Sequence, residues 1–233
     1  MKKIIIPFLL ILTLCSCSSF FSGPVELDIE YPEATVNGET VTYSELEYFE
    51  EHHKSEVMSE FILKYDAVPD DDFWDTPING ETPRQYLYNL CKEKILEAKI
   101  QLILCKENNI YKDISIDHFY QLKEHHNKTF KNNETIGVSQ IPVMYYDYYI
   151  DNGVMELKNI LGKTSLAPTD GEIKNKMISI KEKYPDKIED EQLSIAKDIL
   201  VEEKYEAYIE KLCDEAHVDW GSFDEFQNEL YSN

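Results

Sequence analysis

The stretch Ala34-Thr-Val-Asn-Gly-Glu-Thr-Val-Thr-Tyr-Ser-Glu-Leu-Glu-Tyr-Phe49 changes its pattern halfway along. Its first half places Asn37-Gly38 between β-forming residues, which is the strongest short-range signal for a hairpin. Thr42 and Glu45 then have the spacing of a capping box, and this spacing predicts that a helix begins just after Thr42. The apolar residues that follow recur at helical spacing and indicate one buried face: Leu46, Phe49, Val57, Phe61 and Tyr65.

Further start and stop signals divide the rest of the chain into helices. Thr82-Pro83-Arg84-Gln85 is a second capping box with proline at the first helical position, and it predicts a long helix to about Asn108. Between these two helices, Phe73-Trp74 lies in a predicted loop, where we expect the two rings to plug the core. The chain is therefore expected to be mainly α, with about three very short strands. Later signals predict helices over about 116–128, 142–161, 169–184 and 190–216, a short strand at 217–220 and a last helix capped by Ser222 and Glu225.

The N-terminus has a charged start, a short apolar run and a small-residue exit. Met1-Lys2-Lys3 precedes an apolar run over residues 4–14, which is shorter than the roughly 20 residues that cross a bilayer. This pattern is typical of a secretory signal. The exit Leu14-Cys15-Ser16-Cys17 resembles the bacterial lipobox, which implies a lipid on Cys17; an ordinary secretory signal is the alternative. We expect a signal peptide at 1–16, a lipidated linker at 17–33, and a protein anchored by lipid on the extracytoplasmic side of the cell membrane.

The charge of the chain is strongly negative. It has 45 Asp and Glu residues against 23 Lys and Arg residues, so its formal net charge is −22 at pH 7. A surface of this sign repels nucleic acid and anionic lipid headgroups, which excludes nucleic acid as a partner. The charge favours solubility and the binding of basic or unfolded cationic segments, although most of the carboxylates are interpreted as solvated helix faces.

The sequence has few residues that indicate chemistry. Beyond the lipobox, the cysteines are Cys91, Cys105 and Cys213, which match neither a disulfide framework nor a zinc pattern. Cys91 and Cys105 fall on the apolar stripe of the second predicted helix, so we interpret them as core residues. The pairs His52-His53 and His125-His126 do not chelate well, because adjacent helical side chains point about 100° apart. Phosphate-loop, nucleophile-elbow and HExxH motifs are missing, so we expect no catalytic residue, metal or cofactor.

Four segments of the sequence together resemble one family. The hairpin and helix start at Ala34–Phe49 resemble the start of the peptide-binding domain of SurA and of PrsA-type foldase lipoproteins. Trp74–Tyr86 with its long helix, Ala167–Ile173 and Leu200–Val218 are similar to later parts of these lipoproteins, in the same order.

The resemblance implies a helical chaperone domain that is closed by the C-terminal end of the chain. In the family the closing helix packs back on the N-terminal domain and the terminal strand pairs near the first hairpin, which places Val218 to Trp220 beside Val36 or Val41. The implied boundaries are 34–168 for the SurA/PrsA-like N-terminal helical domain, 169–189 for a connecting helix and loop, 190–220 for the C-terminal helix and strand that complete the domain, and 221–233 for a short terminal helix.

One part of the family pattern is missing. Foldases of this group usually carry a parvulin isomerase domain before the closing helix, and such a domain needs about 90 residues. Here the predicted helices leave almost no chain between Tyr184 and Asp190, and the eight glycines include no Gly-Gly pair. We therefore expect that the catalytic domain is absent, that the protein is not an enzyme, and that binding is the function that remains.

Sixteen tyrosines, four of them clustered at residues 145–149, favour adaptable recognition. Four residues this close cannot all face one core, so either some are exposed or they pack between helices. We expect unfolded or secreted polypeptides to bind in a cleft between the helices near 42–65, 83–108 and 142–161. The alternatives are a dedicated interaction with one envelope partner and a residual peptidyl-prolyl cis-trans isomerase. The residues expected to contact the polypeptide are Phe49, Phe61, Phe73, Trp74, Tyr145, Tyr146, Tyr148 and Tyr149.

Overall fold

The computed structural model describes residues 31–131 and 146–231, with the side chains of these ranges except at 126–131 and 228–231. The structural statements that follow concern this part of the chain. The expected signal peptide at 1–16, the expected lipidation site Cys17 and the aromatic residue Tyr145 lie outside the described residues.

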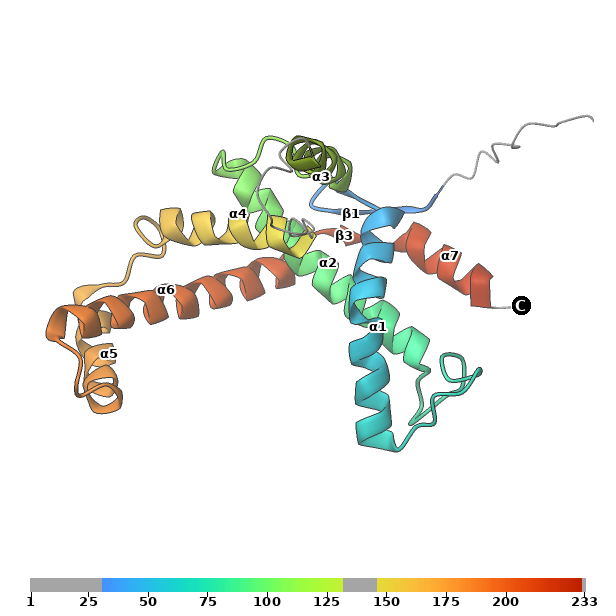
Figure 1. Cartoon of the computed structure of the whole chain (residues 1–233), viewed down its shortest axis with the longest axis horizontal. Coiled ribbons are helices and arrows are strands. Elements are labelled where there is room, and N and C mark those ends of the chain that lie inside the picture. Colours follow the sequence, from blue (N-terminus) through green and yellow to red (C-terminus); the bar gives the residue numbers. More distant parts are fainter. Residues whose placement is uncertain (1–30, 132–145, 232–233) are drawn as a thin grey trace, which may run out of the picture. The chain divides into compact units, whose positions relative to one another are not determined.

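The described chain is mainly helical, as the sequence predicts (Figure 1). The helices begin and end within a few residues of their predicted positions, and the predicted start of the fourth helix near Pro142 lies outside the described ranges. The elements are β1 (Glu33–Val36), β2 (Glu39–Thr42), α1 (Tyr43–Tyr65), α2 (Pro83–Glu107), α3 (Ile116–Lys131), α4 (Tyr146–Leu161), α5 (Asp170–Lys183), α6 (Glu189–Asp214), β3 (Val218–Asp219) and α7 (Gly221–Tyr231).

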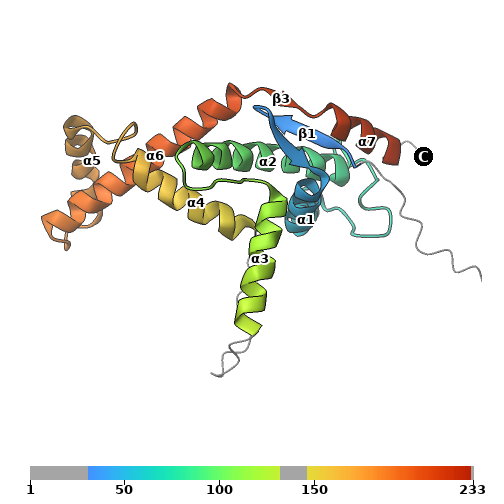
Figure 2. The same cartoon turned by 90° about the horizontal axis from the view of Figure 1, so that it is seen from above.

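The three strands form one antiparallel sheet in the order β2-β1-β3. Asn37 and Gly38 form the turn between β1 and β2 with φ angles of 50° and 81°, a left-handed backbone that Asn and Gly tolerate best. β3 comes from the far end of the chain, and its Val218 lies opposite Val36 of β1. Figure 2 shows the two strands side by side. The expectation that the C-terminal strand returns to the first hairpin is therefore confirmed.

The hairpin turn also holds the residue that precedes β3. The backbone N–H of Asn37 donates to the carbonyl oxygen of His217 at 2.8 Å. In return, the backbone N–H of His217 donates to the side-chain Oδ1 of Asn37, also at 2.8 Å. Asn37 therefore has two roles, because it adopts the turn conformation and clamps the C-terminal segment onto the sheet.

Side-chain caps explain where several helices begin. Thr82 Oγ1 accepts a hydrogen bond from Gln85 N at 3.1 Å, so the predicted capping box of α2 is present. The start of α7 differs from its prediction. Ser222 lies inside that helix, and the N–H of Gly221 donates instead to Asp219 Oδ1 at 3.0 Å. The prediction that Ser222 caps α7 is wrong, because the side chain at the end of β3 has this role.

Helix α2 forms the centre of the core and packs against α1, α4 and α6. Cys91 and Cys105 are fully buried on it, which confirms that they are core residues. Burial raises the pKa of both thiols, that of Cys105 to about 12. Phe73 is buried with its ring centroid 6.4 Å from that of Phe61, so it plugs the core as predicted, whereas its neighbour Trp74 is half-buried.

Candidate functional site

Five of the aromatic residues expected to contact a polypeptide are buried. Each is at most 6% exposed, so none presents a surface on which another chain could lie. These side chains belong to the core, which corrects their assignment as contact residues, because an aromatic ring on an amphipathic helix gains most by burial. The five residues are Phe49, Phe61, Phe73, Tyr146 and Tyr149.

The space between α1 and α4, where we expected a cleft, is filled by these rings. The centroid of the Tyr146 ring lies 6.5 Å from that of Phe49 on α1 and 5.1 Å from that of Phe119 on α3. Tyr149 packs beside Tyr146 and stacks on Tyr111 at 4.3 Å. These rings fill the space between α1 and α4, so the expected cleft is not open between these two helices.

A buried ion pair joins the hairpin to three helices. Glu45 of α1 and Lys99 of α2 are each only 2% exposed, and Lys99 Nζ donates to Glu45 Oε1 at 2.6 Å. The hydroxyl of Tyr146 on α4 donates to the same carboxylate oxygen at 3.0 Å. Burial, and next the negative charge of Glu45, raise the pKa of Tyr146, so its hydroxyl keeps its proton and stays a donor. The three side chains satisfy one another and hold α1, α2 and α4 together.

The two side chains of this ion pair also form hydrogen bonds with the backbone of the edge strand β2. Lys99 Nζ also donates to the carbonyl oxygen of Thr40 at 3.0 Å, and Glu45 Oε2 accepts from the backbone N–H of Thr42 at 3.0 Å. Free backbone groups on an edge strand invite pairing with another chain. The ion pair therefore protects β2 against the addition of a further strand, and its role is structural.

Sequence reasoning missed this network, although Lys99 itself was a signal. Lys99 lies between Ile95 and Leu102 at helical spacing, within the apolar stripe of α2. A lysine at such a position requires a buried partner. Glu45 fits a capping box, and residues of a capping box usually lie at the surface. No sequence pattern links position 45 to position 99.

Two of the expected contact residues remain accessible. Tyr148 is 60% exposed on α4, and half-buried Trp74 has the Lys54 ammonium 5.3 Å from its ring centroid. Met155, which is 67% exposed, lies seven residues after Tyr148 and so on the same face of α4. The outer face of α4 therefore presents two large apolar side chains to solvent, and Met155 was not predicted.

Other exposed apolar side chains lie elsewhere on the described surface. Leu63 and Val68, near the end of α1, are 85% and 70% exposed. Ile178 of α5 and Ile188, which precedes α6, are also more than half exposed. Apolar side chains scattered singly over a surface are normal for a protein, so these residues do not by themselves indicate a binding site.

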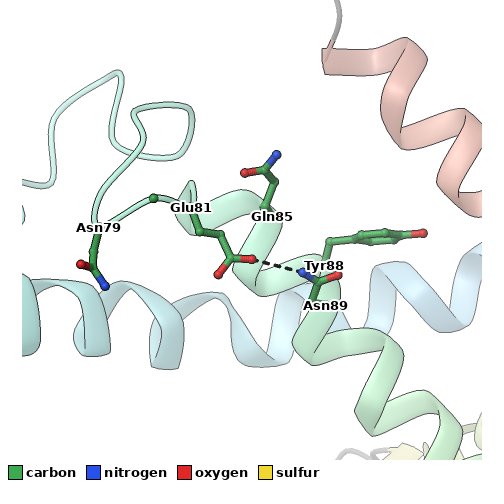
Figure 3. A pocket seen from close by; sticks show the side chains of 6 residues that line it. Asn79, Glu81, Gln85, Tyr88 and Asn89 are labelled. Atoms are coloured by element: carbon green, nitrogen blue, oxygen red, sulfur yellow. Dashed lines mark hydrogen bonds between the residues drawn. The ribbon is translucent and has the colours of Figure 1, made fainter.

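A polar cavity of about 590 Å³ lies where α2 begins (Figure 3). Asn89 Nδ2 donates to Glu81 Oε1 at 3.1 Å across it. Gln85 Oε1 accepts from the backbone N–H of Thr82, and Tyr88 donates to Asp224. In Figure 3 the side chains of Gln85 and Tyr88 point away from Glu81. The side chains of Glu81, Gln85, Tyr88 and Asn89 thus make hydrogen bonds within the chain, and they do not converge on one point.

The side chains of His52 and His53 each have a partner within their own helix. His52 Nδ1 lies 2.7 Å from the carbonyl oxygen of Tyr48, and His53 Nδ1 lies 2.8 Å from Glu56 Oε2. Across residues 31–131 and 146–231, no group of three or more His, Cys, Asp or Glu side chains could hold a metal ion. No helix in these ranges combines the length and the apolar character that a bilayer-crossing segment requires.

Comparisons of the chain with protein-family models, with curated proteins and with solved structures find no match. Function is therefore inferred from the motifs of the sequence and from the geometry of the described residues.

Proposed function

We propose that the chain is a foldase-like lipoprotein that binds unfolded or extended secreted polypeptides outside the cytoplasm, without catalysis. The observation that carries this proposal is the pairing of β3 with β1, in which Val218 lies opposite Val36. A domain whose C-terminal strand completes its first hairpin is what the resemblance to SurA and PrsA-type foldases implies. The four sequence segments that carry the resemblance also occur in the family's order.

Binding is proposed to occur on the outer face of α4. Tyr148 and Met155 are both more than half exposed there, and they are spaced so that one extended segment can contact both. Tyrosine provides apolar area and a hydroxyl at a low cost in side-chain entropy, and methionine adapts to differently shaped partners. The mechanism is the temporary covering of apolar segments that would otherwise aggregate, and it uses neither ATP nor a covalent step.

The acidic surface supports the same function. A formal net charge of −22 keeps a protein soluble while it carries an apolar client, because complexes of like charge repel one another. The connection between α5, which ends at Lys183, and α6, which begins at Glu189, is short. A binding function without a parvulin isomerase domain is therefore the reading that we propose.

The membrane anchor is a separate part of the proposal. We propose that Cys17 carries the lipid, because the sequence around it resembles a lipobox. When the protein is made in a bacterium and partitioned with a detergent that separates into two phases, the wild type should enter the detergent phase and Cys17→Ala should stay in the aqueous phase. A wild-type protein found only in the aqueous phase would exclude the anchor.

Light scattering of a chemically denatured test enzyme, diluted into buffer with the protein, tests the binding function. We expect the wild type to suppress aggregation in proportion to its concentration. Tyr148→Ser/Met155→Ser should suppress it several-fold less well, because the binding face loses its apolar area. The matched control is Ile178→Ser/Ile188→Ser, which removes two equally exposed side chains from another region and should behave like the wild type. No suppression by the wild type at several-fold molar excess would contradict the proposal.

A further inference from the structure

A second cavity lies where β1, α1 and α3 begin. Its volume is about 330 Å³, and we call it the acidic tyrosine cavity after the five residues that define it. Its wall combines carboxylates and phenol rings near the starts of β1 and α1 with a carboxylate of α3, which comes much later in the sequence. The five residues are Tyr31, Glu33, Tyr43, Glu47 and Asp117.

The three carboxylates of this cavity have no ion-pair partner among residues 31–131 and 146–231. Glu33, Glu47 and Asp117 are exposed, and none forms a hydrogen bond or an ion pair with a described residue. Elsewhere on the surface lysines reach carboxylates, as Lys158 reaches Glu202 and Lys176 reaches Glu203. Three negative charges that line one concave surface attract cations from solution.

The tyrosines give the cavity a second means of holding a cation. The ring of Tyr31, which is 56% exposed, stacks on that of Tyr43 with centroids 5.4 Å apart and planes 17° from parallel. Tyr43 also makes an edge contact with Phe226 of α7, with the ring centroids 5.4 Å apart. The exposed face of a fixed tyrosine ring attracts ammonium and guanidinium groups, and it also packs against the methylene stem of Lys or Arg.

The spacing of the carboxylates favours separated cationic side chains over a single metal ion. These carboxylates do not form a group that could hold a metal ion in the described part of the chain. A polypeptide with several lysines or arginines can instead bring one cation to the tyrosine face and others to the rim. The net charge of −22 adds a long-range attraction for such a segment.

We propose that the acidic tyrosine cavity binds Lys or Arg side chains of extended polypeptides, and thereby selects basic segments among the clients of the protein. This inference rests on the proposed function and names its class of substrate. The cavity is separate from the outer face of α4 in its residues, so charge and apolar area are recognised at different places.

Fluorescence anisotropy with two labelled peptides tests the proposal on the full chain. One probe is an unstructured Gly/Ser peptide with three spaced lysines, and the other has glutamate in place of each lysine. The wild type should bind the lysine peptide and not the glutamate peptide, and added salt should weaken binding. Glu33→Gln/Glu47→Gln/Asp117→Asn should bind the lysine peptide about tenfold more weakly, because three separate ion pairs are lost.

The matched control changes the net charge by the same amount at residues outside the cavity. Asp198→Asn/Glu206→Gln/Glu210→Gln neutralises three exposed carboxylates of α6 and should change affinity less than about twofold. Equal weakening by both triple variants would show that the overall field and not the cavity attracts the peptide, which would overturn the proposal. Unchanged affinity in the cavity variant, or displacement of the peptide by submillimolar calcium alone, would overturn it as well. Circular dichroism of each variant checks that the fold is kept.

The results also separate this inference from the proposed function. If the wild type suppresses aggregation but binds the two peptides equally, only the inference about the cavity fails. If the wild type binds the lysine peptide through the cavity but does not suppress aggregation, the chaperone function fails and a site for basic segments remains.

Discussion

Lys99 Nζ lies 2.6 Å from Glu45 Oε1 in a place where both side chains are almost completely excluded from solvent. The two residues are 54 positions apart in the sequence, so their contact fixes how α1 lies on α2. Forming a buried ion pair costs free energy, because both charges lose their hydration. Removing one partner costs more, because the other is left charged in an apolar environment.

Replacing one partner of this pair should be strongly destabilising. We expect Lys99→Met to lower the free energy of unfolding by about 3–5 kcal/mol, since Glu45 would remain buried and unpaired. Glu45→Gln/Lys99→Met should lose less than Lys99→Met alone, because no uncompensated charge remains. Urea denaturation followed by circular dichroism measures both. Lys187→Met breaks an exposed pair with Glu191 and should cost less than about 1 kcal/mol. A double variant that is less stable than Lys99→Met would contradict the argument.

The clamp between Asn37 and His217 can be separated from the turn conformation. Asn37→Gly keeps the left-handed backbone but loses the Oδ1 acceptor, and we expect it to cost about 1–2 kcal/mol. Hydrogen exchange at the His217 amide should accelerate at the same time. Asn79→Gly is the control, because Asn79 has a similar φ of 56° before a glycine and its side chain makes no hydrogen bond to a described residue. Equal effects of the two substitutions would show that the clamp contributes nothing.

Gly153 is required for the contact between α4 and the residues after α2. A Cβ at this position would lie 2.6 Å from Tyr111 Cε2 and 3.0 Å from Cys105 Sγ. Tyr111 cannot move away freely, since its hydroxyl donates to the carbonyl oxygen of Tyr149 and its ring stacks on that residue. We expect Gly153→Ala to lower the free energy of unfolding by about 1–3 kcal/mol.

The control for Gly153→Ala is the glycine in the first turn of α5. A Cβ on Gly171 would meet nothing within 4 Å, so Gly171→Ala should stabilise by up to about 1 kcal/mol, because alanine restricts the unfolded chain. Thermal unfolding of the two variants gives the comparison. A Gly153→Ala protein as stable as the wild type would show that α4 can shift to accept the methyl group.

The packing of α5 against α6 should become weaker at low pH. The hydrogen bond from the Lys204 ammonium, and next the bonds from Thr169, lower the pKa of Glu172 from 4.5 to about 2. Because the pKa is lower in the folded state, this carboxylate stabilises the fold fully above about pH 4.5 and loses that effect as the pH falls towards about 2.

Urea midpoints measured between about pH 2.5 and about pH 6 test this dependence. Glu172→Gln should flatten the part of the profile below about pH 4.5. Glu182→Gln, which changes an exposed carboxylate of α5 that makes no ion pair with a described residue, should leave the profile as in the wild type. Identical profiles of wild type and Glu172→Gln would show that the hydrogen bonds of Glu172 do not couple to folding.

Most element positions followed from local sequence signals. The capping boxes at Thr42, Thr82 and Thr169 placed three helix starts correctly, because a cap is a contact between residues three apart. The start of α7 was misplaced, since its actual cap comes from Asp219 outside the helix. The pairing of β3 with β1 was expected from the family resemblance, and no local signal encodes a contact between strands so far apart.

The contact residues were harder to predict than the helices. Periodicity shows which residues share a helix face. It does not show how much of that face is covered by neighbouring helices. Tyr148 and Tyr149 are adjacent, yet the first is 60% exposed and the second 3%, because about 100° of rotation separates solvent from the core. The acidic tyrosine cavity brings together the starts of β1, α1 and α3, and only the tertiary fold makes these neighbours.

The clamp of Asn37 on His217 joins residues that are 180 positions apart. The sheet can therefore receive its third strand only once residues 217–219 are present, and a chain that stops short of them leaves β1 without a partner on one side. Unpaired strand edges pair with other chains, so a form truncated before residue 217 is expected to aggregate more readily than the full sheet.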